Sequence, residues 1–225
     1  MRPDLTDEPR TNDQEGLTAS DDQAPDLHFL VAGAGFEPRP GFRAKDGAAA
    51  SLDRRAIAAE MDQAWQTFYR LLDQATDTGL RRRSNGTKWT NEQLLFHMLF
   101  GYLITRALLV LARIFGRLPD RASKAFAQLL DAIHGPFHLI NYLGSCAGAR
   151  VIPYSHMRGG LDQVIAALER SLEREREAAL RRGMHYPTTW DPFFADYMTL
   201  ADIYRYPTQH FRFHQRQLTL SPPPG

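Results

Sequence analysis

The chain has 225 residues, of which 43% are hydrophobic, with a net charge of +1 and a sequence pI of about 8.0. This length and composition suit one globular domain with a tail, and the balanced charge gives no reason to expect a nucleic-acid or acidic partner. The single cysteine, Cys146, excludes an internal disulfide and favours a reducing compartment such as the cytoplasm.

The N-terminal part of the chain differs in composition from the rest. Residues 1–27 carry eight acidic and two basic side chains and almost no large apolar ones. Such a segment buries too little apolar surface to offset the entropy lost on ordering it. We therefore expect a disordered acidic extension over residues 1–50, a folded domain over residues 51–220 and a short tail over residues 221–225.

The first predicted helix begins near Ser51 or Leu52 and runs to about Asp77. Its apolar residues recur at helical spacing, which is typical of an amphipathic helix that buries one face. They are Ile57, Met61, Ala64, Trp65, Phe68, Leu71 and Leu72. The basic run at residues 81–83 that follows is interpreted as a solvated turn, because no basic face extends it.

A second helix begins at Thr90, where Thr90 and Gln93 fit a capping box preceded by the apolar Trp89. Residues 94–105 and 107–112 are uncharged, which raises the alternative of a membrane span. His97 and Arg106 interrupt this stretch, so a helix buried between neighbours, or at a homodimer contact, explains the pattern better. We therefore expect no membrane partner.

The middle of the chain predicts three further helical segments. The first two cover residues 119–134 and 137–149, with a break at Gly135-Pro136 between them. Small residues at 144–148 allow close helix approach or line a cavity. A long helix follows Gly159-Gly160, and its core stripe consists of Leu161, Val164, Ile165, Leu168 and Leu172.

The last third of the chain begins with an aromatic-rich loop, residues 185–195. Helix resumes at Met198–Tyr206, and Pro207 is expected to interrupt it before it restarts with His210 and His214. No segment shows the two-residue alternation of a strand. The sequence therefore predicts an all-α protein, a bundle of four main helices with long connections.

His210 and His214 lie four residues apart, so they share one face of a helix and can chelate a single metal ion. A site needs a third protein ligand, and His97 is the best candidate. Taken alone, a histidine on an apolar helix is more often a hydrogen-bonded core residue, and a pair at this spacing also arises by chance. His134 and His138 share the spacing, but the expected break separates them.

Two stretches, Trp89–Phe115 with His97 and Pro207–Leu218 with the histidine pair, resemble the DinB-like superfamily of helical metalloproteins. That superfamily includes mycothiol-dependent maleylpyruvate isomerases and bacillithiol transferases. The resemblance covers about residues 52–220. It implies a four-helix bundle that holds one divalent metal through one histidine of the second helix and a pair of the last. The implied metal ligands are His97, His210 and His214.

This ligand set implies a chemistry. Three neutral imidazoles leave the ion its full charge and at least one open position, where zinc lowers the pKa of bound water and favours thiolate over thiol. Zinc is expected, with nickel or iron as alternatives. Each histidine that binds the metal through one ring nitrogen should donate the N–H of its other ring nitrogen to an acceptor, and Asp202 is the candidate.

Three functions stay open on this basis. The first is a metal-dependent transferase that acts on a small-molecule substrate with a low-molecular-weight thiol of the mycothiol type. The other two are a metal-dependent hydrolase and a non-catalytic metal-binding or ligand-binding module. Arg205, Arg212 and Arg216 lie near the histidine pair in sequence and are candidates to bind a carboxylate of the substrate or of the thiol.

Overall fold

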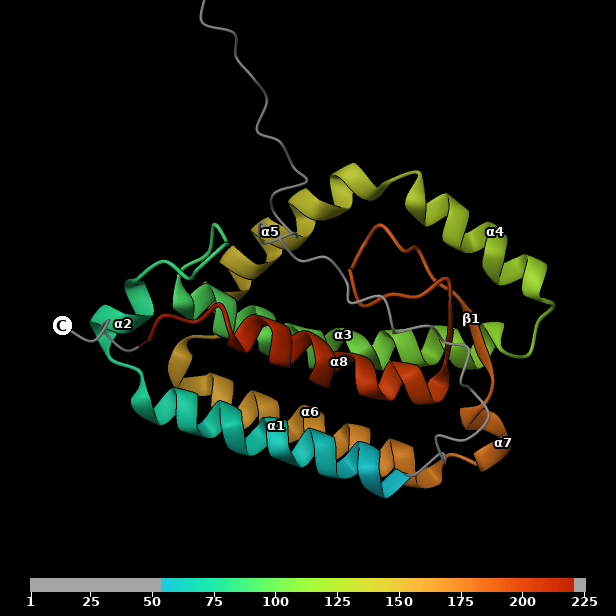
Figure 1. Cartoon of the computed structure of the whole chain (residues 1–225), viewed down its shortest axis with the longest axis horizontal. Coiled ribbons are helices and arrows are strands. Elements are labelled where there is room, and N and C mark those ends of the chain that lie inside the picture. Colours follow the sequence, from blue (N-terminus) through green and yellow to red (C-terminus); the bar gives the residue numbers. More distant parts are fainter. Residues whose placement is uncertain (1–53, 221–225) are drawn as a thin grey trace, which may run out of the picture.

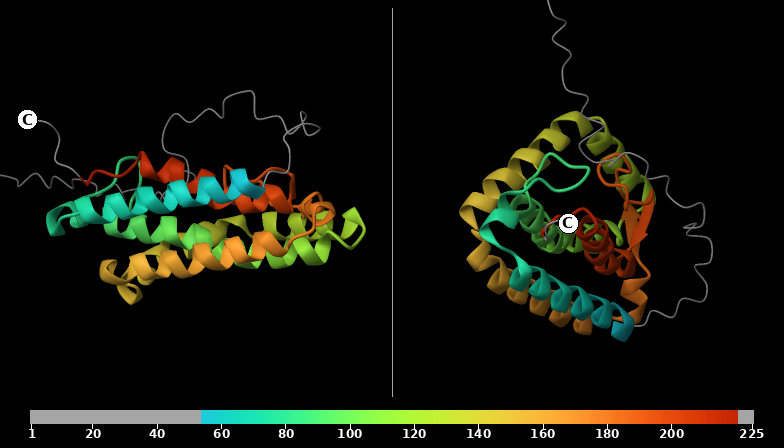
Figure 2. Two further views of the ribbon diagram at one scale, coloured as in Figure 1. Left: turned by 90° about the horizontal axis from the view of Figure 1, so that it is seen from below. Right: turned by 60° about the vertical axis from the view of Figure 1, so that its left-hand side comes forward.

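The computed structural model describes residues 54–220, apart from the side chains of three residues near the start of one helix, and shows the predicted all-α architecture (Figure 1). Four long helices form the bundle: α1 (Arg54–Gln74), α3 (Asn91–Phe115), α6 (Tyr154–Arg174) and α8 (Leu200–Gln215). Both α1 and α3 contact α6 and α8, so the four helices close into a ring around one core (Figure 2). The extension and tail expected at residues 1–50 and 221–225 lie outside the described residues.

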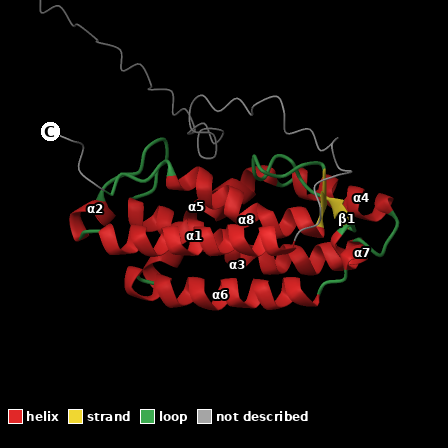
Figure 3. Ribbon diagram, turned by 60° about the horizontal axis from the view of Figure 1, so that its bottom comes forward, coloured by secondary structure: helices red, strands yellow, loops and turns green. Residues whose placement is uncertain are grey.

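Shorter elements connect the long helices. They are α2 (Asp77–Arg81), α4 (Asp120–Asp131), α5 (His134–Val151), α7 (Glu177–Leu180), β1 (Gly183–His185) and β2 (Tyr197–Thr199). In Figure 1, α4 and α5 form an arch that rises above α3, and the segment between β1 and β2 lies under this arch. Figure 3 shows that the two short strands lie at one end of the bundle, beside α4 and α7.

Helix α1 forms because its apolar stripe meets the core, as its spacing predicted. The fully covered members are Ile57, Met61, Ala64, Phe68 and Leu72. Beside this stripe, Trp65 Nε1 and Tyr69 Oη each donate a hydrogen bond of 2.6 Å to Asp162 Oδ1 of α6. A carboxylate with two short charge-assisted bonds fixes the rotation of α1 against α6.

Helix α3 begins with the predicted capping box, in which the Thr90 and Gln93 side chains each accept from the other's backbone N–H. It is long and apolar enough to cross a membrane, yet 56% of its most apolar 18-residue window is buried inside the protein. At its far end the Arg113 guanidinium donates to Glu175 Oε1 at 2.7 Å and to Tyr204 Oη at 3.1 Å. These contacts tie α3 to α6 and α8 within the bundle.

Two predicted helix boundaries are wrong. Helix α6 begins at Tyr154, after Pro153, and includes Gly159-Gly160 instead of following them. The Tyr154 hydroxyl donates to the Leu72 carbonyl of α1, and a Cβ at Gly160 would lie 3.3 Å from the Leu99 side chain, so helix packing extends α6 through the glycines. Helix α5 likewise includes the Gly135-Pro136 pair, because proline is tolerated in the first turn of a helix.

The expectation of no strand is also wrong. Strands β1 and β2 pair antiparallel, with Met184 opposite Met198. Gly183 is required there, because a Cβ on it would lie 2.1 Å from the Met198 carbonyl oxygen. Three-residue strands are too short to show alternation in a sequence, and their pairing depends on residues 12 to 16 positions away. The pair closes the aromatic-rich loop into a fixed hairpin.

Helix α8 is continuous from Leu200 to Gln215, so the predicted interruption at Pro207 is wrong. Proline removes one helical hydrogen bond and normally costs about 3 kcal/mol in a helix interior. Here the residues around it are buried, and Thr208 Oγ1 pairs with Tyr102 Oη of α3 at 3.1 Å. Packing against α3 therefore holds the two halves of α8 in line.

Two glycines of α5, one turn apart, give a matched test of this packing. A Cβ at Gly148 would lie 2.1 Å from the Phe96 ring of α3, whereas a Cβ at Gly144 meets nothing within 4 Å among the described atoms. We expect Gly148→Ala to lower the free energy of unfolding by about 1–3 kcal/mol through overpacking. Gly144→Ala should leave it unchanged or raise it by up to about 1 kcal/mol. Urea unfolding of both variants checks this, and equal effects would contradict the close approach of α5 to α3.

Candidate metal centre

Three histidines from two neighbouring helices converge in the core. His97 comes from α3, and His210 and His214 come from α8, which packs alongside α3. One ring nitrogen from each lies within 4.8 Å of the others, and the three residues are only 5%, 4% and 9% exposed, respectively. The structure thus brings together the three residues that the sequence singled out, in a group that can hold a metal ion.

Hydrogen bonding fixes which nitrogen of His97 faces the centre. Ser145 Oγ of α5 donates to the Asn141 carbonyl at 2.9 Å, so its single hydrogen is already used. The same oxygen lies 3.0 Å from His97 Nδ1 and therefore accepts from the Nδ1–H group. This tautomer leaves a lone pair on His97 Nε2, which points toward His210.

The two histidines of α8 have different surroundings. The Gln217 Oε1 carbonyl oxygen lies 2.7 Å from His214 Nδ1, so Nδ1–H donates to it and the Nε2 lone pair is again free. His210 Nδ1 is buried without a hydrogen-bond partner among the described atoms. It lies against Gly101 of α3, where a Cβ would come within 2.8 Å of Nδ1. Gly101 thus leaves room for the His210 ring.

The spacing of the ring nitrogens fits a metal ion. His97 Nε2 and His210 Nε2 are 3.1 Å apart. Two nitrogens that both present lone pairs repel at this distance unless a proton or a cation lies between them. For zinc bonded to nitrogen at about 2.0–2.1 Å, tetrahedral geometry places neighbouring ligand nitrogens about 3.3 Å apart. The donor set and the spacing of this pair therefore suit a divalent ion bound by imidazole nitrogens, and all three nitrogens lie within 4.8 Å of one another.

An aromatic wall encloses one side of the centre. The indole of Trp89 stacks on the His97 ring at 4.4 Å between centroids and meets the His214 ring edge-on at 6.3 Å. The ring of Tyr142 of α5 also stacks with this indole, at 6.1 Å between centroids. This wall excludes water and restricts the imidazoles to one orientation. The sequence assigned Trp89 only to the helix start.

A carboxylate that the sequence reading missed lies beside the centre. Asp191, from the loop between β1 and β2, has Oδ2 at 3.9 Å from His210 Nε2 and is 14% exposed. Its Oδ2 accepts from the Tyr206 hydroxyl at 2.9 Å, and its Oδ1 accepts from the Phe193 backbone N–H at 2.9 Å. Burial raises the pKa of Asp191 above its usual value, against the opposing effect of these donors.

Asp202, the acceptor expected from the sequence, does not contact the histidines. Its Oδ2 accepts from the Thr199 backbone N–H at 2.9 Å, so it caps the start of α8. The acceptors are instead Ser145 and Gln217. Ser145 could not be found from sequence spacing, because it belongs to a helix that is distant in sequence from both His97 and the histidine pair. Gln217 lies three residues after His214, where the end of the helix turns it back.

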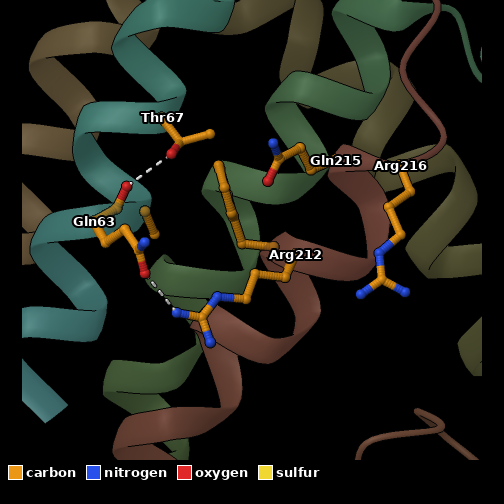
Figure 4. A pocket seen from close by; sticks show the side chains of 7 residues that line it. Gln63, Thr67, Arg212, Gln215 and Arg216 are labelled. Atoms are coloured by element: carbon orange, nitrogen blue, oxygen red, sulfur yellow. Dashed lines mark hydrogen bonds between the residues drawn. The ribbon is translucent and has the colours of Figure 1, made fainter. Parts of the chain in front are cut away.

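The arginines expected to help at the metal lie on the other side of α8. Arg212 and Arg216 line a pocket of about 500 Å³ between α1 and α8, and Arg212 donates to Gln63 Oε1 at 2.9 Å (Figure 4). Residues two apart on an α-helix point to nearly opposite sides, so Arg212 is turned away from His210. Arg205, seven residues before Arg212, shares this far face.

Burial keeps all three imidazoles neutral. It lowers the pKa of His210 to about 4 and that of His214 to about 3. The pKa of His97 is lowered well below its usual value, first by burial and then by repulsion from the other two rings. Neutral imidazole is the metal-binding form, so these ligands remain competent in mildly acidic solution.

The fold and this centre together define a helical bundle with a buried three-histidine group able to hold a metal ion. The family model of the DinB superfamily matches residues 60–218, which is most of the chain, and the chain belongs to that superfamily. Searches among curated proteins and among solved structures found no match.

The lowered pKa values predict a specific pH dependence for the metal-free protein. In the unfolded chain histidine titrates near 6.5, whereas His210 in the folded protein titrates at about 4 and His214 at about 3. The unfolded state therefore binds more protons between these values, and stability falls as pH is lowered from about 6.5 toward 4. Urea unfolding across this range, in the presence of a chelator, checks the trend. His210→Gln should weaken the dependence, and an unchanged slope in that variant would contradict the assignment.

Proposed function

We propose that His97, His210 and His214 bind one divalent ion, with zinc as the expected metal, and that the protein is a metal-dependent transferase using a low-molecular-weight thiol. The observation that carries this proposal is the convergence of three neutral imidazole nitrogens within 4.8 Å, in a family of metal-binding proteins. Imidazole suits zinc and also nickel and iron, which are the alternative metals.

The count of protein ligands supports catalysis over a purely structural role. Structural zinc sites are closed by four protein ligands, whereas catalytic sites use three and keep one position for water or substrate. Among the described residues, the group of potential ligands at this centre contains three members. When bound there, the ion supplies a Lewis acid that keeps a thiol in its reactive thiolate form at neutral pH.

The chain's own residues prepare this position. Ser145 and Gln217 fix the ring orientation of His97 and His214, and Trp89 closes one side. The pocket with Arg212 and Arg216 faces the other way, so a carboxylate held there would not reach the metal. We therefore assign substrate recognition to the aromatic and loop residues on the α3 side of α8, beside the histidines.

Location and assembly are part of the same proposal. A cytoplasmic location is supported by Cys146, the single cysteine of the chain, because it is partly buried and can form no internal disulfide. A homodimer through α3 is supported by two exposed apolar residues one turn apart on this helix, Val110 and Ile114, and by Leu118 just beyond its end, all 46–50% exposed. Metal-dependent hydrolysis and non-catalytic metal binding are the outcomes that remain if no thiol chemistry is found.

Metal content per chain tests the centre. We expect about one divalent ion per parent chain, and near-complete loss in His97→Ala, His210→Ala and His214→Ala, because two remaining imidazoles do not hold the ion against a weak chelator. His156→Ala, an exposed histidine of α6, is the matched control and should keep full metal. Elemental analysis after gel filtration gives the result. Full metal in His97→Ala would overturn the three-histidine centre.

Thiol binding tests the function. The protein loaded with Co²⁺ in place of zinc should develop a sulfur-to-metal charge-transfer band on addition of a small thiol, because the open position admits the sulfur. The band should be absent from His214→Ala. Product formation should then follow in a screen of thiol and electrophile pairs. Metal binding without a thiol band would leave the centre standing and contradict the transferase.

A further inference from the structure

Asp191 approaches the centre from an unusual side. Carboxylates near a metal-bound histidine ordinarily accept from the ring nitrogen that does not bind the metal. Here that nitrogen of His210 is Nδ1, which lies against Gly101. Asp191 Oδ2 instead lies 3.9 Å from His210 Nε2, the nitrogen that faces His97 Nε2 at 3.1 Å. The carboxylate therefore faces the ligand side of the ring, where the ion and its fourth ligand would lie.

The position of this carboxylate is fixed from two elements. Tyr206 precedes His210 by one turn of α8, so its hydroxyl reaches Asp191 Oδ2 from the same helix that carries two of the histidines. The Phe193 backbone N–H holds Oδ1, and the Phe194 N–H donates to the Asp191 carbonyl at 3.0 Å, which closes a turn. Each carboxylate oxygen accepts about two hydrogen bonds. The bonds from Tyr206 and Phe193 therefore leave Asp191 with acceptor capacity.

Among the described residues, the Asp191 carboxylate contacts no Lys or Arg side chain, so its negative charge is not neutralised and acts on the three-histidine centre. A fixed carboxylate beside an open position favours ligands that bring a hydrogen, such as water or a thiol, because Oδ2 can accept the proton that such a ligand gives up when it would bind the ion as hydroxide or thiolate. It repels anions that bring none, because like charges in a buried site are strongly unfavourable. Asp191 is not among the residues whose ligand atoms group with the three histidines, which is consistent with a contact to the ligand instead of to the ion.

We propose that Asp191 is the specificity-determining residue of the metal centre, selecting a hydrogen-donating fourth ligand such as a thiol over a simple anion, with Tyr206 as its positioning residue. This inference rests on the proposed metal centre. It adds the class of ligand that the centre accepts and names the atom that recognises it, Asp191 Oδ2.

The test compares two ligands on the full chain loaded with Co²⁺. Absorption titrations give the affinities for 2-mercaptoethanol, which carries an S–H group, and for azide, an anion without one. In Asp191→Asn, which has the same shape without the charge, we expect the ratio of thiol to azide affinity to fall by about tenfold or more, since hydrogen bonds to charged groups are of that strength. Tyr206→Phe should lower the ratio in the same direction by less.

Asp196→Asn is the matched control. Asp196 belongs to the same loop but is 77% exposed and contacts His185, away from the centre. The ratio of thiol to azide affinity in Asp196→Asn should therefore equal that of the parent. Metal content is measured on every variant. Loss of Co²⁺ from Asp191→Asn would identify a direct metal ligand and overturn the proposal, and so would an unchanged ratio with full metal.

Failure of the proposed function gives a different pattern. If the parent chain binds no Co²⁺, the proposed metal centre is wrong. A parent that binds Co²⁺ but no thiol contradicts the transferase, while a rise in azide affinity in Asp191→Asn still supports the role of this carboxylate. If Asp191→Asn does not fold, judged by circular dichroism, Tyr206→Phe decides, and an unchanged ratio in that variant overturns the proposal.

Discussion

The His97 and His210 imidazoles approach closely, with 3.1 Å between their Nε2 atoms, and the surrounding residues must hold both rings in this position. Both rings are buried and neutral, so the facing nitrogens need either a proton on one of them or a shared cation. Several features hold them in place: Gly101 leaves space for one ring, Ser145 orients the other, and Trp89 covers it. A proton on His210 Nε2, donated to His97 Nε2, satisfies this contact without an ion, and a bound cation would replace that proton.

The second face of α8 shows how one helix separates two environments. His210 and His214 face α3 in the core, whereas Arg212 and Arg216 face a pocket beside α1. Proximity in sequence therefore misled the interpretation of these arginines, because two residues along a helix is half a turn in space. The same geometry explains why Tyr206, one turn before His210, belongs to the metal centre although its side chain is not itself a ligand.

Local signals in the sequence predicted most of the helices and singled out the three histidines that the structure brings together. The capping box at Thr90, the apolar stripe of α1 and the spacing of His210 and His214 depend on residues within a few positions of one another. The errors concern long-range packing. Burial against α3 keeps α8 straight through Pro207, and the acceptor Ser145 comes from a separate helix, 48 residues after His97. Neither effect leaves a pattern in one sequence.

The two parts of the centre lie far apart in the chain, since His97 and His210 are separated by 113 positions. Contacts of such separation form late, because closing a long loop costs entropy before any contact compensates for it. A ribosome must therefore have released α8 before the three histidines can come together. If they bind an ion as proposed, binding follows the synthesis of α8, and an incomplete chain that lacks this helix would offer His97 alone.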